Sequence, residues 1–289
     1  MSLVTRLPIP SSWIDLPHAC QSLFLRRDWP RSRQMRRVIG RIINRLLKPT
    51  GFRFSRLASP PETPTPHPSP AASNMSLDAA LSRISARGLD VNTVIDVGAS
   101  DGMWTRVVRQ YFPSAFCLLI EANPVHETDL RKFRQELANV DFVLAAAGDV
   151  VGEIYFDATD PFSGLASHTP LARPTITVPV TTIDALVAQR QLKAPFLIKL
   201  DTHGFEGPIL EGARQTLQDT NLLVIEAYNF RLRPGSLKFD ELCQLLSTLG
   251  FATIDFCDPM FRVRDNAFWQ FDLFFIRADR AEFQSNGYF

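Results

Sequence analysis

The sequence has no run of about 18 consecutive apolar residues, so it predicts no helix that spans a membrane. Cysteine is scarce as well, with four in 289 residues and no C-x-x-C pair among them. Neither a zinc knuckle nor a disulfide framework is therefore expected, and free thiols fit a reducing compartment. The N-terminus lacks the basic region and continuous apolar core of a secretory signal. We therefore expect a cytoplasmic protein.

Two common motifs are also missing. The chain contains no G-x-G-x-x-G, because Gly98 has no second glycine two positions later, and this argues against a dinucleotide-binding oxidoreductase. The spacing G-x-S-x-G does occur at Gly98–Gly102, as in the nucleophile turn of the α/β-hydrolases. However, the α/β-hydrolase order requires a histidine late in the chain, after the fifth predicted strand. None of the five histidines lies there, since the last of them is His203.

Charge is distributed unevenly along the chain. Residues 1–58 contain 12 Lys or Arg and two acids, a net charge of +10, so the remainder carries −9 of the total of +1. Residues 35–48 place apolar side chains at helical spacing opposite several arginines, which predicts a basic amphipathic helix. This helix could lie on an anionic membrane at its inner face, or pack its apolar stripe on the rest of the protein. No aromatic platform accompanies the arginines, so no nucleic-acid partner is expected.

A proline-rich stretch separates this basic arm from the rest of the chain. The sequence SPPETPTPHPSP, residues 59–70, has six prolines in twelve positions and predicts an extended linker. The predicted organisation is therefore a basic arm at 1–58, a linker at 59–72 and a single domain at 73–289.

Within that domain, strand-like apolar runs alternate with helical patterns. This alternation predicts an α/β fold with a doubly wound, mostly parallel sheet. The predicted strands are Thr93–Val97, Phe116–Glu121, Phe142–Ala146, Phe196–Leu200, Leu222–Glu226, Thr253–Phe256 and Phe271–Ile276. The predicted helices are Ser76–Arg87, Met103–Tyr111, Val125–Leu137, Ile183–Gln189, Phe205–Leu217 and Leu237–Leu249. Only a loop joins the last two strands, which predicts a hairpin and an antiparallel last strand.

The first strand leads into a glycine-rich turn in the sequence TVIDVGASDGMW. Asp96 ends this strand, and Gly98 and Gly102 let a ligand approach the backbone closely. Glu121 ends the second strand, where an acid can accept hydrogen bonds from both hydroxyls of a ribose. After the third strand, the small turn Ala145–Asp149 could face an adenine edge.

This order of elements is the layout of class I S-adenosylmethionine methyltransferases. The predicted cofactor-binding residues are Asp96, Gly98, Ala99, Ser100, Gly102, Glu121, Ala122 and Ala147. For Asp96 alone, a role as a helix or turn cap is the alternative, because aspartate is favoured at such positions.

The motifs VIDVGASDGMW, IEANP, AAAGDVVGEIYF, VPVTTIDAL, LIKLDTHGFEGPILEGA and LLVIEAYN together resemble the FkbM family of methyltransferases. The resemblance extends from Thr93 to Ile276. It implies a Rossmann-like class I fold, S-adenosylmethionine as methyl donor and O-methylation of a hydroxyl, often on a sugar or polyketide. The chain departs from the family at Ser100, where asparagine is usual. It also has DTHGFE where DVEGAE is commoner, although a subset of the family carries DT-x-GFE.

Polar residues at the ends of the next two strands are the candidates for chemistry. Asp201, the first residue of DTHGFE, falls at the carboxyl end of the fourth strand, at the edge where open α/β sheets bind ligands. The next strand ends in Glu226, and Asn229 lies just beyond it. Asp201, Glu226 and Asn229 could bind Mg²⁺, which would orient an acceptor oxygen and lower its pKa. Alternatively, His203 is a direct general base, since imidazole exchanges protons near neutral pH. Lys199 could pair with Asp201, because both side chains leave the strand on the same side.

The sequence therefore predicts a methyltransferase that uses S-adenosylmethionine to methylate a hydroxyl of a sugar, glycan or natural product. The predicted catalytic residues are Asp201 and His203. The segment Phe162–His168 is either an acceptor-side loop or an ordinary Ser/Gly loop. A non-catalytic scaffold that retains the methyltransferase fold is the alternative function.

Overall fold

The computed structural model describes residues 74–172 and 174–288. The predicted arm at 1–58, its amphipathic stretch at 35–48 and the linker at 59–72 lie outside the described residues. None of the helices within the described ranges is long and apolar enough to cross a membrane.

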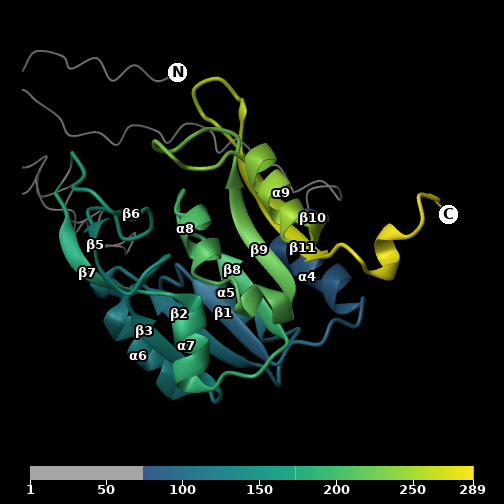
Figure 1. Cartoon of the computed structure of the whole chain (residues 1–289), viewed down its shortest axis with the longest axis horizontal. Coiled ribbons are helices and arrows are strands. Elements are labelled where there is room, and N and C mark those ends of the chain that lie inside the picture. The colour runs from purple at the N-terminus through teal and green to yellow at the C-terminus, as the bar shows by residue number, and fades with distance from the viewer. Residues whose placement is uncertain (1–73, 173, 289) are drawn as a thin grey trace, which may run out of the picture. The chain divides into compact units, whose positions relative to one another are not determined.

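A seven-stranded sheet with the order β10-β11-β9-β8-β1-β2-β3 lies at the centre of the described chain (Figure 1). Its strands are β1 (Thr93–Val97), β2 (Phe116–Glu121), β3 (Val140–Leu144), β8 (Phe196–Leu200), β9 (Thr220–Tyr228), β10 (Phe251–Phe261) and β11 (Phe268–Arg277). Neighbours among β1, β2, β3, β8 and β9 are parallel, whereas β11 is antiparallel to both β9 and β10. The predicted α/β class, with its antiparallel last strand, is confirmed.

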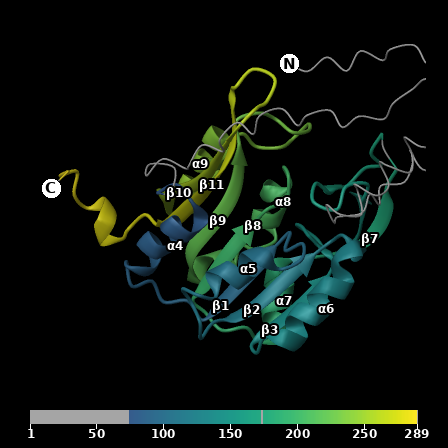
Figure 2. The ribbon, with the colours of Figure 1, turned by 180° about the vertical axis from the view of Figure 1, so that it is seen from behind.

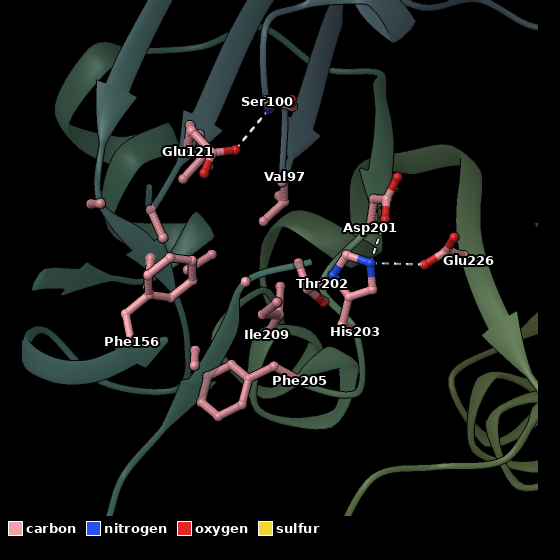
Figure 3. Close-up of a pocket in the computed structure, with 18 of the residues that line it drawn as sticks. Val97, Ser100, Glu121, Phe156, Asp201, Thr202, His203, Phe205, Ile209 and Glu226 are labelled. Carbon is pink, nitrogen blue, oxygen red and sulfur yellow. Dashed lines mark hydrogen bonds and ion pairs between the residues drawn. The ribbon is translucent and has the colours of Figure 1, made fainter. Parts of the chain in front are cut away.

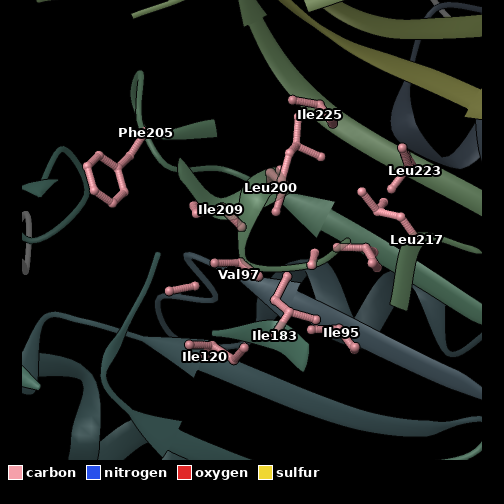
Figure 4. Close-up of a cluster of buried hydrophobic side chains, with 14 of the residues drawn as sticks. Ile95, Val97, Ile120, Ile183, Leu200, Phe205, Ile209, Leu217, Leu223 and Ile225 are labelled. Atoms are coloured by element: carbon pink, nitrogen blue, oxygen red, sulfur yellow. The ribbon is translucent and has the colours of Figure 1, made fainter. Parts of the chain in front are cut away.

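Helices cover both faces of this sheet, as Figures 1 and 2 show from opposite sides. One face packs on α4 (Leu77–Ser85), α5 (Met103–Val108) and α6 (Glu127–Glu136), and the other on α7 (Ile183–Arg190), α8 (Glu206–Glu211) and α9 (Phe239–Thr248). Single-turn 3₁₀ helices lie at Pro124–His126, Thr216–Asp219 and Ala281–Phe283. Successive strand residues enter opposite cores, so Val94 packs toward α4 while Ile95 packs toward α7 (Figure 4). All of β1 is buried, as expected of a central parallel strand.

A second, four-stranded sheet was not predicted. It consists of β4 (Ala146–Ala147), β5 (Gly152–Asp157), β6 (Leu165–Ser167) and β7 (Ile176–Thr181), in the order β4-β7-β5-β6. Its strands are short, and Pro179 argues against a strand because it has no N–H to donate. Pro179 is tolerated because β4 pairs with β7 only at Val180 and Thr181. Alternate side chains such as Ile154 and Val178 join the core beneath α7 and α8.

Several predicted boundaries also differ from the structure. The predicted helix 205–217 ends at Glu211. The next residue, Gly212, lies so close to Gly148 that a Cβ would be 2.0 Å from the Gly148 oxygen, which requires glycine there. The predicted strand 142–146 is divided between β3 and β4. The predicted loop at 162–168 contains β6, so it forms part of the small sheet.

The turn that follows β1 packs directly on the turn that follows β8. Gly98 has a φ of +77°, and a Cβ at this position would lie 2.0 Å from the backbone oxygen of Asp201. The amide of Asp201 in turn donates to the carbonyl of Val97 at 3.0 Å. Only glycine allows both the conformation and the close approach.

We expect Gly98→Ala to lower the free energy of unfolding by at least about 2 kcal/mol, because it adds backbone strain to a steric clash. Urea unfolding followed by circular dichroism measures the change. Gly207→Ala is the matched control: a Cβ at Gly207 meets nothing within 4 Å, and its helical position favours alanine. Equal stability of the two variants would contradict the role assigned to the contact.

Candidate active site

A cavity of about 280 Å³ opens at the carboxyl ends of β1, β2, β8 and β9 (Figure 3). This is the edge at which open α/β sheets bind ligands, and the volume lies near the lower end of the range for small-molecule sites. One end is formed by the turns after β1 and β2, and the other by the turn after β8 and by Glu226 at the end of β9. The small sheet contributes Phe156 and Ala166 to the wall.

Glu121 lies at the first end of the cavity and is held by two backbone amides. Its Oε2 accepts from the amide of Ser100 at 2.7 Å, and its Oε1 accepts from the amide of Asn123 at 2.6 Å. Burial raises the pKa of Glu121, and these two amides oppose that effect. Each carboxylate oxygen keeps a further lone pair, so this side chain can accept from two ribose hydroxyls.

The other predicted cofactor residues fall into two groups. Gly98, Ser100, Ala122 and Ala147 line the cavity together with Glu121. Asp96, Ala99 and Gly102 do not line it. The fully buried Asp96 accepts a hydrogen bond from the Thr105 hydroxyl at 2.6 Å, which ties the end of β1 to α5. Burial raises the pKa of Asp96, and the charge of Lys199 opposes this effect.

Aromatic and small apolar residues form the wall between Glu121 and the small sheet. Phe156 comes from β5, which the sequence did not mark as part of the site. Phe162 comes from the segment between β5 and β6 and is the first residue of the possible acceptor-side loop Phe162–His168. The imidazole of the buried His126 lies 2.8 Å from the Pro161 oxygen and 3.4 Å from the Ser100 hydroxyl. This histidine therefore connects the covering segment to the turn after β1.

Three titratable side chains converge at the opposite end of the cavity (Figure 3). His203 Nε2 lies 3.7 Å from Glu226 Oε2 and 4.0 Å from Asp201 Oδ1. His203 itself has a φ of +51°, an uncommon conformation for a residue with a side chain. The structure thus brings the predicted catalytic residues Asp201 and His203 together with Glu226.

Asn229 lies outside this group. Its side-chain amide donates to the Phe268 carbonyl at 3.2 Å, and its backbone amide donates to the Trp269 carbonyl at 2.9 Å. Asn229 is an odd number of residues from Glu226, so the two side chains leave the extended chain on opposite sides. His203 rather than Asn229 therefore lies beside Asp201 and Glu226, and the metal role predicted for Asp201, Glu226 and Asn229 stays a prediction.

The two carboxyl groups of the site have opposite surroundings. Lys199, which is 3% exposed, donates to Asp201 Oδ2 at 2.7 Å. Burial alone would raise the pKa of Asp201, but the Lys199 charge and hydrogen bond hold it below its usual value. Burial and the nearby Asp201 charge raise the pKa of Glu226, whose two oxygens accept from Tyr228 and Gln270. The surroundings therefore favour the ionised form of Asp201 and the protonated form of Glu226.

The turn that carries His203 is fixed from two directions. Glu206, in the first turn of α8, accepts from the amide of Gly204 at 2.8 Å. Arg233 Nε and Nη2 donate to the Gly204 carbonyl at 3.0 and 2.8 Å, and its Nη1 donates to the Ala166 carbonyl in β6. Arg233 therefore joins the segment after β9 to the catalytic turn and to the small sheet. Nothing in the local sequence around Arg233 indicates this role.

The strand order and the cavity at the carboxyl edge define a class I methyltransferase. The family model described as the methyltransferase FkbM domain matches residues 96–253, which is more than half of the chain. The chain belongs to this family and is an S-adenosylmethionine-dependent methyltransferase. The resemblance inferred from the motifs is therefore confirmed.

Three solved structures illustrate the wider likeness. Precorrin-6y C5,15-methyltransferase from Geobacter metallireducens is 12% identical with a TM-score of 0.36, covering 68% of this chain and 86% of its own. The Methanococcus jannaschii fibrillarin pre-rRNA processing protein is 13% identical, with a TM-score of 0.42 and coverages of 65% and 66%. Magnesium protoporphyrin IX methyltransferase from Synechocystis, with bound S-adenosylmethionine, is 12% identical, with a TM-score of 0.39 and coverages of 69% and 77%. No curated protein matches.

We expect Glu121→Gln to weaken the binding of S-adenosylmethionine at least about tenfold, which corresponds to about 1.4 kcal/mol. The amide loses the charge, and its NH₂ group faces the amide of Ser100 or Asn123 donor to donor. Isothermal titration calorimetry measures the dissociation constant. Glu136→Gln, an exposed position on α6, is the control and should leave it unchanged. Unaltered binding by the Glu121 variant would remove this residue from the cofactor site.

Proposed function

We propose that the protein transfers a methyl group from S-adenosylmethionine to a hydroxyl of a sugar, glycan or other natural product. The observation that supports this is the arrangement of the cavity, with Glu121 at one end and Asp201, His203 and Glu226 at the other (Figure 3). When bound, S-adenosylmethionine supplies an electrophilic methyl group. The residues around the cavity then have to hold an acceptor oxygen in line and remove its proton.

The residues that would hold the cofactor are those at the first end of the cavity. The Glu121 carboxylate would bind the ribose, and the backbone at Gly98 and Ser100 leaves room for close approach. Small residues such as Ala122 and Ala147 would contact the adenine together with Phe156. The chemistry and the sizes of these side chains fit the cofactor.

Two ways of removing the hydroxyl proton are consistent with the other end. In the first, the His203 imidazole takes the proton directly, and the ionised Asp201, 4.0 Å away, stabilises the resulting positive charge. In the second, a divalent cation such as Mg²⁺ would lower the pKa of the hydroxyl. Of the ligands expected for Mg²⁺, Asp201 and Glu226 are close enough to share an ion, whereas Asn229 is bonded to Phe268.

We expect Asp201→Asn and His203→Gln to lower the rate of methyl transfer at least about 100-fold while leaving S-adenosylmethionine binding within about twofold. Tritiated S-adenosylmethionine, incubated with cell-envelope glycan and small-molecule extracts, supplies the assay and identifies the labelled acceptor. Asp219→Asn, exposed at the opposite end of β9, is the control and should retain full activity.

The same experiment separates the enzyme from the scaffold alternative. A native protein that binds no S-adenosylmethionine in calorimetry would support a scaffold that keeps only the fold. Binding of the cofactor together with labelling of an acceptor that is not methylated on oxygen would refute the proposed acceptor class instead.

Contact between residues 35–48 and an anionic membrane stays a prediction from the sequence. Its basis is the net charge of +10 on residues 1–58 together with the apolar stripe. In liposome flotation with phosphatidylserine vesicles, we expect the full chain to float and a chain without residues 1–58 to stay at the bottom. Equal flotation of the two chains would contradict it.

A further inference from the structure

We propose that Asp201, His203 and Glu226 form a binding site for a divalent transition-metal cation, with a preference for ions such as Co²⁺, Fe²⁺ or Zn²⁺ over Mg²⁺. The proposal deepens the proposed function, since the cation would lie where the acceptor hydroxyl has to be activated. It replaces Asn229 with His203 in the ligand set, and this replacement changes the kind of ion that the site selects.

The spacing of the three ligand atoms fits one ion. One ligand atom from each side chain lies within 4.8 Å of the other two. An ion bound by His203 Nε2 would have to bridge 3.7 Å to Glu226 Oε2 and 4.0 Å to Asp201 Oδ1. Two metal–ligand bonds of about 2.1 Å each reach across at most about 4.2 Å, so both distances from His203 lie within reach of one ion, and the ligand atoms would draw closer together around it.

The chemical nature of the ligands selects the ion. Mg²⁺ requires near-octahedral oxygen coordination and is usually held by carboxylates, phosphates and water. Imidazole nitrogen suits iron, cobalt, nickel and zinc better, and the affinity of a nitrogen and oxygen site for divalent ions generally rises from manganese to copper and falls again at zinc. A site with one imidazole and two carboxylates therefore favours the later ions, whereas a site built with Asn229 would have offered oxygen alone.

Neighbouring residues hold both carboxylates in position for such an ion. Lys199 donates to Oδ2 of Asp201 and leaves Oδ1 turned toward His203. Tyr228 and Gln270 each donate to one oxygen of Glu226, and each of these oxygens keeps a second lone pair. Donors behind the ligands are a regular feature of protein metal sites, where they orient the ligand atoms.

The charge balance of this region also favours a cation. Lys199 interacts with the carboxyl groups of Asp96, Asp201 and Asp272, and Glu226 adds a fourth acid beside Asp201. Among the described residues, this cluster therefore places one lysine beside four acids. A divalent ion between Asp201 and Glu226 would offset the repulsion of two carboxylates that lie close together.

All three ligands line the cavity, so an ion can reach them from solvent. The ion would also be accessible to an oxygen of the acceptor, since the same cavity continues to the cofactor end. A second group of potential ligands, Cys257, Asp258 and Asp272, is present on β10 and β11 and has to be distinguished by experiment.

The test is calorimetric titration of the full chain with CoCl₂ and, separately, with MgCl₂, after treatment with EDTA and removal of the chelator. We expect one Co²⁺ per chain, bound at least about tenfold more tightly than Mg²⁺. His203→Gln should weaken Co²⁺ binding at least about tenfold while changing Mg²⁺ binding little, because only the nitrogen ligand is lost. Glu226→Gln should weaken the binding of both ions.

Two control variants test whether Co²⁺ binds at His203 and not elsewhere. Asn229→Ala removes the ligand expected from the sequence, and Asp258→Asn alters the second group, so both should bind Co²⁺ like the native chain. Co²⁺ binding that survives His203→Gln but is lost in either control would overturn the proposal, as would a native chain that binds no Co²⁺.

Titration of each variant with S-adenosylmethionine keeps the two proposals apart. Loss of Co²⁺ binding with intact cofactor binding in His203→Gln supports the metal site and shows that the domain is folded. A native chain that binds the cofactor but no Co²⁺ refutes the metal site and leaves the methyltransferase proposal standing, with His203 as the direct base. A native chain that binds Co²⁺ but no cofactor refutes the methyltransferase proposal alone.

Discussion

The contact between Gly98 and the backbone of Asp201 is the constraint on which the site depends. β1 and β8 are far apart in the sequence but adjacent in the sheet, with Asp96 opposite Lys199 and Val97 opposite Leu200. This register places the turns that follow the two strands against each other. The cofactor end and the acceptor end of the cavity therefore share one rigid backbone contact, and the distance between them does not rely on flexible side chains.

Lys199 links the same two turns through its charge. Its ammonium group is buried beneath the two turns and lies close to Asp96 on one side and Asp201 on the other. A buried charge is stable only when it is paired, so the lysine and its acids fix one another. Because Lys199 reaches Asp201 but makes no hydrogen bond with Glu226, the two acids of the active site hold their protons differently. This difference between Asp201 and Glu226 follows from side-chain alternation at the end of β8, which places Lys199 next to Asp201.

Local sequence patterns predicted the parts of the site that lie on or next to regular strands. Asp201 and Glu121 directly terminate buried strands, and their positions at the carboxyl edge follow from parallel pairing alone. The position of Asn229 did not follow from the local pattern: β9 continues to Tyr228, and the side-chain amide of Asn229 donates to the Phe268 carbonyl. The small sheet was not predicted for a different reason. Its strands are short, and they are stabilised by packing on a core built from distant residues.

Arg233 shows why the acceptor side is harder to read from sequence than the cofactor side. The cofactor turn, with its glycines and Glu121, is encoded by short motifs next to β1 and β2. The acceptor side is assembled from the turn after β8, the segment after β9 and the small sheet, and one guanidinium joins them through the carbonyls of Gly204 and Ala166. Backbone carbonyls carry no sequence signature, so a residue that acts through them leaves no motif. The end of the cavity proposed for the donor is therefore encoded by motifs, whereas the end proposed for the acceptor depends on how three separate segments come together around His203.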